Sequence, residues 1–287
     1  MSQFLDTHSL SYEQRTMIMD ILTDTKRLKV KLTELQARIF FDRVIKPYNN
    51  KRDNPMYFYT IHDKHNGVFL GLHPREACIA KDYTVALSFH SYSHGSALLE
   101  LIFSVVPLER WMVSEIHVAF DFHGLPYEQF HVVRPAKRAD TYVNPTSMYI
   151  GKPSSAASLY IYDKQVQMME KKGIHTDTWT RVEMRYNLPR MKKVSELTEK
   201  DFAAANHYYV FTDTSQLPDH IKLIVHDLNA DMISWMDDVP RRTKDKIREC
   251  ASTQAVNLGS SLLSKLENTD IGAFIYTPLK QLGELTS

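Results

Sequence analysis

SEIHVAFDF, residues 114–122, is the stretch that decides the fold of this chain. Polar and apolar residues alternate along it, and successive side chains of a β-strand point to opposite faces of the sheet. The pattern therefore predicts a strand with one apolar face and one polar face. The polar face would carry Glu115, His117 and Asp121.

Two later stretches, SLYIYDK (158–164) and WTRVEMRYN (179–187), repeat this alternation and predict two more strands. Their polar faces would carry Tyr160, Tyr162 and Lys164 on the first strand, and Arg181, Glu183 and Arg185 on the second. If the three strands are neighbours, carboxylates, phenols and cations meet on one face of a sheet. Such a face is costly to leave dry and unpaired, so it predicts a binding site.

The rest of the chain places this sheet between helices. Asn66-Gly67 predicts a hairpin turn between strands, because both residues tolerate a positive φ. The other expected strands are 56–63, 68–72, 83–90 and 146–151, with a loop or short helix over 123–145. The expected helices are 11–46, 96–104, Leu197–Tyr208, Asp219–Trp235 and Thr243–Ala255. Strands dominate the middle and helices the ends, which predicts an α+β fold around an antiparallel sheet.

We therefore expect three parts: an N-terminal helical segment (1–50), a catalytic sheet core (51–190) and a C-terminal helical region (191–287). Hydrophobic residues make up 43% and charged residues 24% of the 287 residues, which is ordinary for a chain that forms a core. The formal net charge is +1, so any nucleic-acid surface must come from local clusters of Lys and Arg. No signal peptide or spanning segment is evident, and we expect a soluble, cytoplasmic protein.

The residue types on the polar faces suit metal-assisted phosphoryl transfer. Carboxylates hold Mg²⁺ or Mn²⁺ through oxygen, and cations offset negative charge that develops on a phosphate. A tyrosine oxygen can attack the phosphodiester once a neighbour or a metal activates it, since a free phenol has a pKa of roughly 10. Taken singly, each of these faces is also typical of the solvent side of a strand. The coincidence of three favours a site.

The order of these segments resembles the replication initiation factor (Rep_trans) family of rolling-circle plasmid Rep proteins. That family has a Tyr-Ile-Gly segment with a following Ser, then a Tyr-Asp/Glu-Lys strand, then an Arg-x-Glu-x-Arg strand. Here these are Tyr149-Ile150-Gly151 with Ser154 or Ser155, then 162–164, then 181–185. The resemblance covers roughly residues 55–190. No single motif is specific for the family, but the order and spacing of the motifs taken together are more specific for it.

The resemblance implies a DNA-nicking and DNA-joining enzyme of bacterial cytoplasm. Tyr162 would be the nucleophile that forms a 5′-phosphotyrosyl link at a plasmid double-strand origin, and Lys164 and Arg181 would contact phosphates. Asp121 and Glu183 would bind Mg²⁺ or Mn²⁺, and DNA, a second copy of the chain, a host helicase and a polymerase would be the partners. The family often has Arg and Asp where this chain has Glu115 and His117, which leaves the ligand set open. Glu115 is a further candidate metal ligand, and His117 either ligates the metal or orients another ligand.

Several assignments stay open on sequence alone. Tyr160 shares a face with Tyr162 and is the rival nucleophile, and it also joins Arg185 as a candidate DNA contact. His90 and His94 are either turn residues or metal ligands. A basic run after Pro240 predicts either a solvated helix face or an origin-binding helix, and it consists of Arg241, Arg242, Lys244, Lys246 and Arg248. Basic residues within 11–46 leave the same two interpretations open.

Four functions fit the pattern. The first is a rolling-circle replication initiator. The second is a conjugative relaxase with the same chemistry, and the third is a DNA-binding regulator without catalysis. The fourth is a metal-dependent phosphodiesterase that uses water as its nucleophile. No Walker-type phosphate loop is present, so no ATPase activity is proposed.

Overall fold

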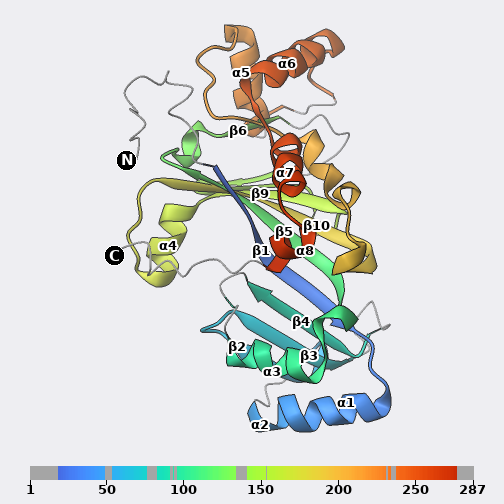
Figure 1. The fold of residues 1–287 in the computed structure, drawn as a ribbon. Coiled ribbons are helices and arrows are strands. Elements are labelled where there is room, and N and C mark those ends of the chain that lie inside the picture. Colours follow the sequence, from blue (N-terminus) through green and yellow to red (C-terminus); the bar gives the residue numbers. More distant parts are fainter. Residues whose placement is uncertain are drawn as a thin grey trace, which may run out of the picture.

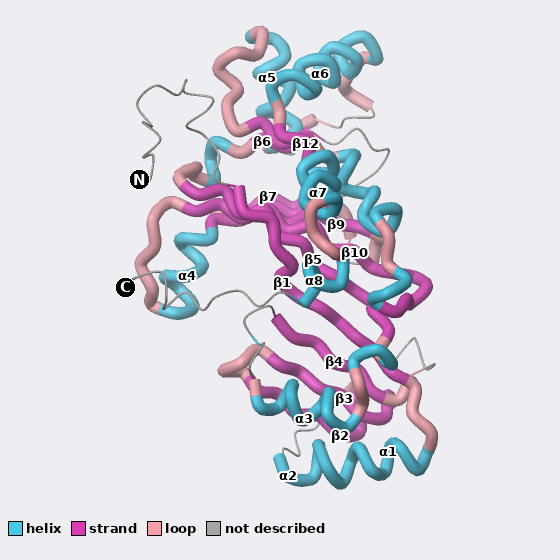
Figure 2. Tube along the Cα trace, viewed as in Figure 1, coloured by secondary structure: helices cyan, strands magenta, loops and turns pink. Residues whose placement is uncertain are grey.

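The computed structural model describes residues 19–48, 54–75, 83–90, 93, 96–133, 141–152, 154–230, 232–233 and 237–276. Its centre is a twisted nine-stranded sheet, ordered β2-β3-β4-β1-β5-β10-β9-β8-β7 (Figures 1 and 2). Every neighbouring pair in this order is antiparallel. The expected α+β class is therefore confirmed.

The strands of this sheet are β1 (Met19–Val30), β2 (Tyr57–Asp63), β3 (Val68–Pro74), β4 (Val85–His90), β5 (Met112–His123), β7 (Thr141–Asn144), β8 (Ser147–Ile150), β9 (Ala157–Asp163) and β10 (Trp179–Lys193). The alternation in β5 works as expected, because Ile116, Val118 and Phe120 are fully buried on its apolar side. The β2–β3 hairpin turns at Asn66-Gly67, where Gly67 has a φ of 62°.

Helices cover the apolar side of the sheet in two groups (Figure 1). The first group lies against β2–β4 and contains α1 (Glu34–Phe40), η2 (Phe41–Ile45), α2 (Lys46–Tyr48) and α3 (Ala97–Val105). The second group lies against the middle strands and contains η6 (Val194–Glu196), η7 (Glu199–His207), α7 (Leu258–Glu267) and α8 (Ile271–Tyr276). Three further short helices are η4 (Leu108–Arg110), η5 (Tyr127–Gln129) and α4 (Lys164–Lys172).

A second, smaller core lies at one end of the molecule (top of Figure 2). It is built on a three-stranded sheet ordered β12-β11-β6, with helices α5 and α6 against it. The bounds are β6 (His131–Val133), β11 (Tyr209–Phe211), α5 (Asp219–Asn229), α6 (Arg241–Gln254) and β12 (Val256–Asn257). Phe211, Ile221, Val225 and Ile247 are fully buried within it.

The expectation of a helix over 11–46 is wrong for the stretch that forms β1, and helix begins only at Glu34. Apolar residues at Leu28 and Leu32 are four apart, a spacing that fits one face of a helix and also one face of a strand. Pairing with β4 and β5 decides for the strand. Thr33 then caps α1 through a capping box with Gln36. Residues 11–18 lie outside the described part.

Other boundaries differ in smaller ways. The sequence predicts a loop or short helix over 123–145, and this segment includes the short helix η5 but also the strands β6 and β7. Strand β10 continues to Lys193 through an irregular stretch after Asn187. The sheet thus extends past both ends of the expected 51–190 core. The remaining strands, the helix at 96–104 and the helix at Thr243–Ala255 are confirmed within a few residues. No helix in the described ranges has the length and apolarity needed to cross a bilayer.

Candidate active site

Strand register brings the polar faces of β5, β9 and β10 together. Arg181 pairs with Tyr162 on one side and with Asp121 on the other. Two residues further along the same face, Glu183 pairs with Tyr160. Paired residues of antiparallel strands point to the same face, so the expected convergence of phenols, carboxylates and cations takes place on one face of the sheet.

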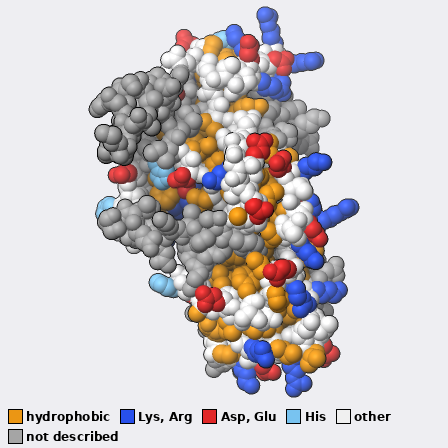
Figure 3. Space-filling view, in the orientation of Figure 1, with side chains coloured by type: hydrophobic (Ala, Val, Ile, Leu, Met, Phe, Trp, Pro, Cys, Tyr) orange, Lys and Arg blue, Asp and Glu red, His pale blue; other side chains and the backbone are white. Residues whose placement is uncertain are grey.

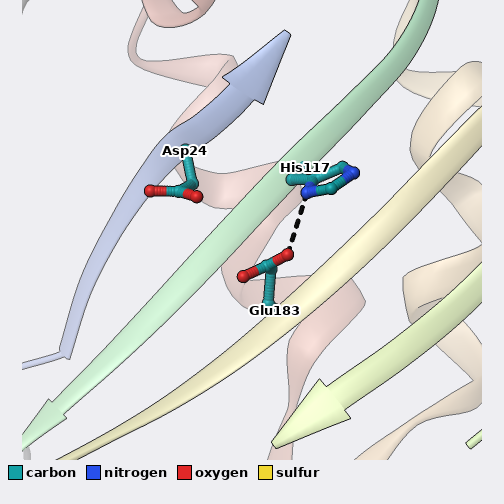
Figure 4. A group of neighbouring side chains, drawn as sticks. All are labelled: Asp24, His117 and Glu183. Atoms are coloured by element: carbon teal, nitrogen blue, oxygen red, sulfur yellow. Dashed lines mark ion pairs between the residues drawn. The ribbon is translucent and has the colours of Figure 1, made fainter. Parts of the chain in front are cut away.

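Three ligand-type side chains meet on this face: Asp24, His117 and Glu183 (Figure 4). One donor atom from each lies within 4.8 Å of the other two. His117 Nδ1 is 2.8 Å from Glu183 Oε1, and Asp24 approaches from the neighbouring strand β1. One imidazole nitrogen and two carboxylate oxygens form a donor set that fits a divalent cation such as Mn²⁺.

Asp24 is the residue that sequence reasoning missed, because the apolar spacing of its segment predicts a helix. In β1 the register shifts between Thr23 and Lys26, so that Asp24 and Thr25 both lie opposite His117. An extra residue of this kind is a β-bulge, which bends the strand and re-aims a side chain. The flanking threonines in LTDTK are a strand-type signal that the helix interpretation overlooked.

Asp24 is held in place by its neighbours. Arg181 donates from an Nη atom to Asp24 Oδ1 over 3.1 Å, and His90 Nδ1 lies 3.7 Å from Asp24 Oδ2. Burial acts to raise the pKa of Asp24, but the hydrogen bond with His90 and the charge of Arg181 outweigh it and lower the pKa. The carboxylate therefore stays ionised. His90 thus lies beside Asp24, a member of the candidate metal-binding group, whereas His94 lies outside the described residues.

Glu115 orients His117 rather than joining the group of three. Its Oε1 lies 2.5 Å from His117 Nε2, and its Oε2 accepts from Arg27 over 2.7 Å. Burial acts to lower the pKa of His117, but hydrogen bonds with Glu115 and Glu183 outweigh it and raise the pKa. A carboxylate on the far nitrogen of a histidine is the usual arrangement behind a metal-binding imidazole.

Asp121, expected as a metal ligand, has both oxygens engaged by Arg181. Arg181 donates from Nε to Oδ1 over 2.6 Å and from an Nη atom to Oδ2 over 2.7 Å. Both side chains are buried. With the third contact to Asp24, each of the three guanidinium nitrogens donates to a carboxylate, and Arg181 links Asp24 to Asp121. The expected phosphate contact of Arg181 stays a prediction.

The hydroxyl of Tyr162 points toward the group formed by Asp24, His117 and Glu183. The hydroxyl donates to Glu183 Oε2 over 3.5 Å. The side chain is 4% exposed, and burial raises the pKa of its phenol, so the group is protonated in the free protein. For this phenol to act as a nucleophile, its oxygen would have to be uncovered and a base would have to accept its proton.

Tyr160, the rival nucleophile, lies in the middle of a stack of rings. Its ring is 3.9 Å from that of Tyr149 and 4.5 Å from that of Tyr162. Burial, together with a hydrogen bond to Tyr149, raises its pKa to about 12. Arg185 packs over Tyr149 and Tyr160 and donates from Nε to Glu183 over 2.9 Å. Geometry thus favours Tyr162 as the phenol next to the carboxylates.

Lys164 lies in α4 and not on the strand face where it was expected. Asp163 ends β9 and caps α4 by accepting from the backbone of Val166, which places Lys164 at the first helical position. Its Nζ nevertheless lies 5.5 Å from the centre of the Tyr162 ring. Burial and the charge of Arg181 lower the pKa of Lys164 to about 8.

The basic run after Pro240 lies far from this face, on α6 at one end of the molecule. Figure 3 shows Lys and Arg side chains (blue) projecting at that end. Most of these side chains are exposed; Lys244 is half-buried, and Arg248 forms an ion pair with Asp245 at 2.7 Å. Arg241, Arg242 and Lys246 complete the run. Its role in DNA binding stays a prediction.

Comparisons with known proteins add little. No protein-family model matches the chain, and no curated protein sequence matches it. Among solved structures, the chain is similar to one described as a rolling circle replication initiator protein from Geobacillus stearothermophilus. The match has 15% identity and a TM-score of 0.43, and it covers 83% of this chain and 99% of the other. At this level of similarity, the function has to be derived from the geometry of the site.

Proposed function

We propose that this protein is a rolling-circle replication initiator that nicks and rejoins one DNA strand through Tyr162. One observation carries the proposal: the hydroxyl of Tyr162 lies 3.5 Å from Glu183, a member of the Asp24–His117–Glu183 group. A phenol beside a candidate divalent-cation site, with the Lys164 amine close to its ring, supplies the groups needed for nucleophilic attack on a phosphodiester.

In the proposed reaction, the oxygen of Tyr162 attacks phosphorus and forms a tyrosyl phosphodiester. The bond from phosphorus to the 3′-oxygen breaks, and that oxygen takes up a proton and leaves as a 3′-hydroxyl. The Glu183 carboxylate is the nearest described acceptor for the phenolic proton. The reverse attack by a 3′-hydroxyl rejoins the strand without ATP, because the phosphodiester energy is retained in the tyrosyl link.

Residues around Tyr162 have separate tasks. Asp24, His117 and Glu183 would hold Mg²⁺ or Mn²⁺, and the bound cation would supply Lewis-acid stabilisation of negative charge on the phosphodiester. Arg181 positions Asp24 and Asp121. Lys164, in its protonated form, offsets the negative charge of the phosphate.

Supercoiled plasmid carrying the cognate origin, incubated with protein and Mn²⁺, should give nicked and relaxed DNA. Tyr162→Phe should abolish both products and the covalent adduct seen on a denaturing gel, while DNA binding persists. Tyr160→Phe is the matched control and should still form the adduct. A fully active Tyr162→Phe protein overturns the assignment.

The same gel separates the alternatives. Nicking without an adduct is the outcome for a phosphodiesterase that uses water. Origin binding without nicking or metal dependence is the outcome for a regulator. A conjugative relaxase would share the adduct and differ in its genetic neighbourhood.

A further inference from the structure

A row of tyrosines crosses the edge of the sheet and ends at the proposed active site. Tyr142 on β7 pairs with Tyr149 on β8, and Tyr149 pairs with Tyr160 on β9. The next residue in the same row is Glu183 on β10. Since neighbouring strands lie about 4.8 Å apart, the row leads in a straight line from the edge strand to the carboxylates.

The rings of this row are partly open. Tyr142 is 58% exposed, and Tyr149 and Tyr160 are half-buried. Tyr149 and Tyr160 stack with an interplanar angle of 15°, so one face of Tyr149 is covered by its neighbour. Within the described ranges, Tyr142 makes no ring contact with Tyr149, which leaves the other face of Tyr149 without a partner ring. Cross-strand pairing alone does not require a large exposed ring at the edge.

A cation lies beside the rings. The guanidinium carbon of Arg185 is 5.1 Å from the centre of the Tyr160 ring and 5.6 Å from that of Tyr149. Arg185 uses Nε for Glu183. Within the part of the chain that the structure describes, its terminal nitrogen atoms make no such bond, and they are donors suited to a phosphate. Aromatic rings with an adjacent arginine form the usual surface on which single-stranded nucleic acid binds.

We propose that Tyr142 and Tyr149 are a stacking track for the bases of the single DNA strand that leads to Tyr162, with Arg185 contacting a phosphate of that strand. Tyr160 is packed between Tyr149 and Tyr162, so it supports the track without stacking on a base itself. The inference rests on the proposed function only for the destination of the strand. Binding by the track is a separate property, because it requires neither a divalent cation nor cleavage.

Fluorescence anisotropy with a labelled single-stranded oligonucleotide, in EDTA so that cleavage cannot contribute, tests the track in the full chain. Tyr142→Ala and Tyr149→Ala should each weaken binding by roughly 5- to 100-fold, the loss of one stacked base. Tyr142→Phe and Tyr149→Phe keep the ring and should bind like the parent. Tyr59→Ala, at the opposite edge strand, is the matched control and should also bind like the parent.

A duplex of the same sequence and an abasic oligonucleotide complete the test. Neither has unpaired bases to stack, so the alanine variants should bind both as the parent does. The proposal is overturned if the alanine variants keep parental affinity for the single strand, if they lose affinity for the duplex equally, or if the phenylalanine variants lose as much. Track-dependent binding by a protein that forms no adduct would leave this inference standing and remove the proposed function instead.

Discussion

At the scale of single residues, two aspartates have opposite tasks although both lie beside Arg181. Asp121 gives both oxygens to the guanidinium, whereas Asp24 gives one oxygen and belongs to the group with His117 and Glu183. The first is a buried ion pair, and the second is a candidate ligand. Substitution should separate the two roles.

We expect Asp24→Asn to weaken Mn²⁺ binding, measured by calorimetry or by the paramagnetic resonance of free Mn²⁺, by roughly tenfold or more. Asp121→Asn should instead lower the free energy of unfolding by about 3–5 kcal/mol, because it removes one of the two carboxylate charges beside a buried guanidinium. Urea unfolding checks the second effect. Equal Mn²⁺ affinity in Asp24→Asn and the parent would contradict the ligand assignment.

Lys164 sets a pH limit on the proposed reaction. Its pKa is lowered to about 8 by burial and by the charge of Arg181, with Asp24 and Asp121 opposing the shift and Lys172 adding to it. The protonated form that offsets phosphate charge is therefore lost as pH rises above about 8. We expect kcat/KM for nicking to fall toward tenfold per pH unit there.

Lys164→Arg keeps its charge at all these pH values, so its profile should stay flat above pH 8 even if its maximum is lower. Lys164→Gln should have a low kcat/KM that does not change with pH across this range. If kcat/KM of the parent protein stays constant up to pH 10, the charge of Lys164 does not contribute to the rate of nicking.

At the scale of elements, β6 and α5 meet through two histidines. His131 Nε2 lies 3.3 Å from His226 Nδ1, and their ring centres are 4.0 Å apart. Burial and the charge of His226 lower the pKa of His131 from 6.5 to about 4. The folded protein therefore keeps His131 neutral at a pH where an unfolded chain protonates it.

A depressed histidine pKa makes folding less favourable as pH falls from the unfolded value of 6.5 to the folded value of about 4. By pH 5 the loss from His131 should reach about 2 kcal/mol. Urea unfolding at pH 7 and pH 5 measures it. His131→Phe cannot titrate, and it should lose that much less stability than the parent over the same interval; an identical loss would contradict the prediction.

At the scale of the whole molecule, α6 and the segment α1–α2 lie at opposite ends (Figure 1), and both expose basic side chains. Arg241, Arg242 and Lys246 are exposed on α6, and the segment α1–α2 exposes Arg38, Arg43 and Lys46. Each set carries the same charge. If the protein has the proposed function, we expect the α6 set to contact duplex DNA outside the candidate active site.

Replacing the three α6 residues by alanine should weaken duplex-origin binding. The slope of log affinity against log salt should also become shallower, by about 0.9 for each DNA phosphate that the variant no longer neutralises. Replacing Arg38, Arg43 and Lys46 removes an equal charge and should change neither quantity. Filter binding from low to high salt measures both slopes. If the second set accounts for the weakening, the N-terminal helical surface is the one that binds DNA.

The sequence alone determined the antiparallel sheet and the residues of its polar faces in β5, β9 and β10. Alternation along a strand is a local property, so it can be read without knowing which strands pair. For the same reason, His117, Glu183 and Tyr162 can be named as candidate site residues before any fold is known.

Only the tertiary structure decided which of these side chains act on one another. Asp24 joins the site because β1 enters the middle of the sheet and bulges opposite His117, and Asp121 is occupied because register places it beside Arg181. Register and bulges depend on pairing between strands that are distant in sequence, and the spacing of Leu28 and Leu32 fitted helix and strand equally. Pairing between distant strands, which no local sequence pattern encodes, determined which charged side chains contact one another in the site.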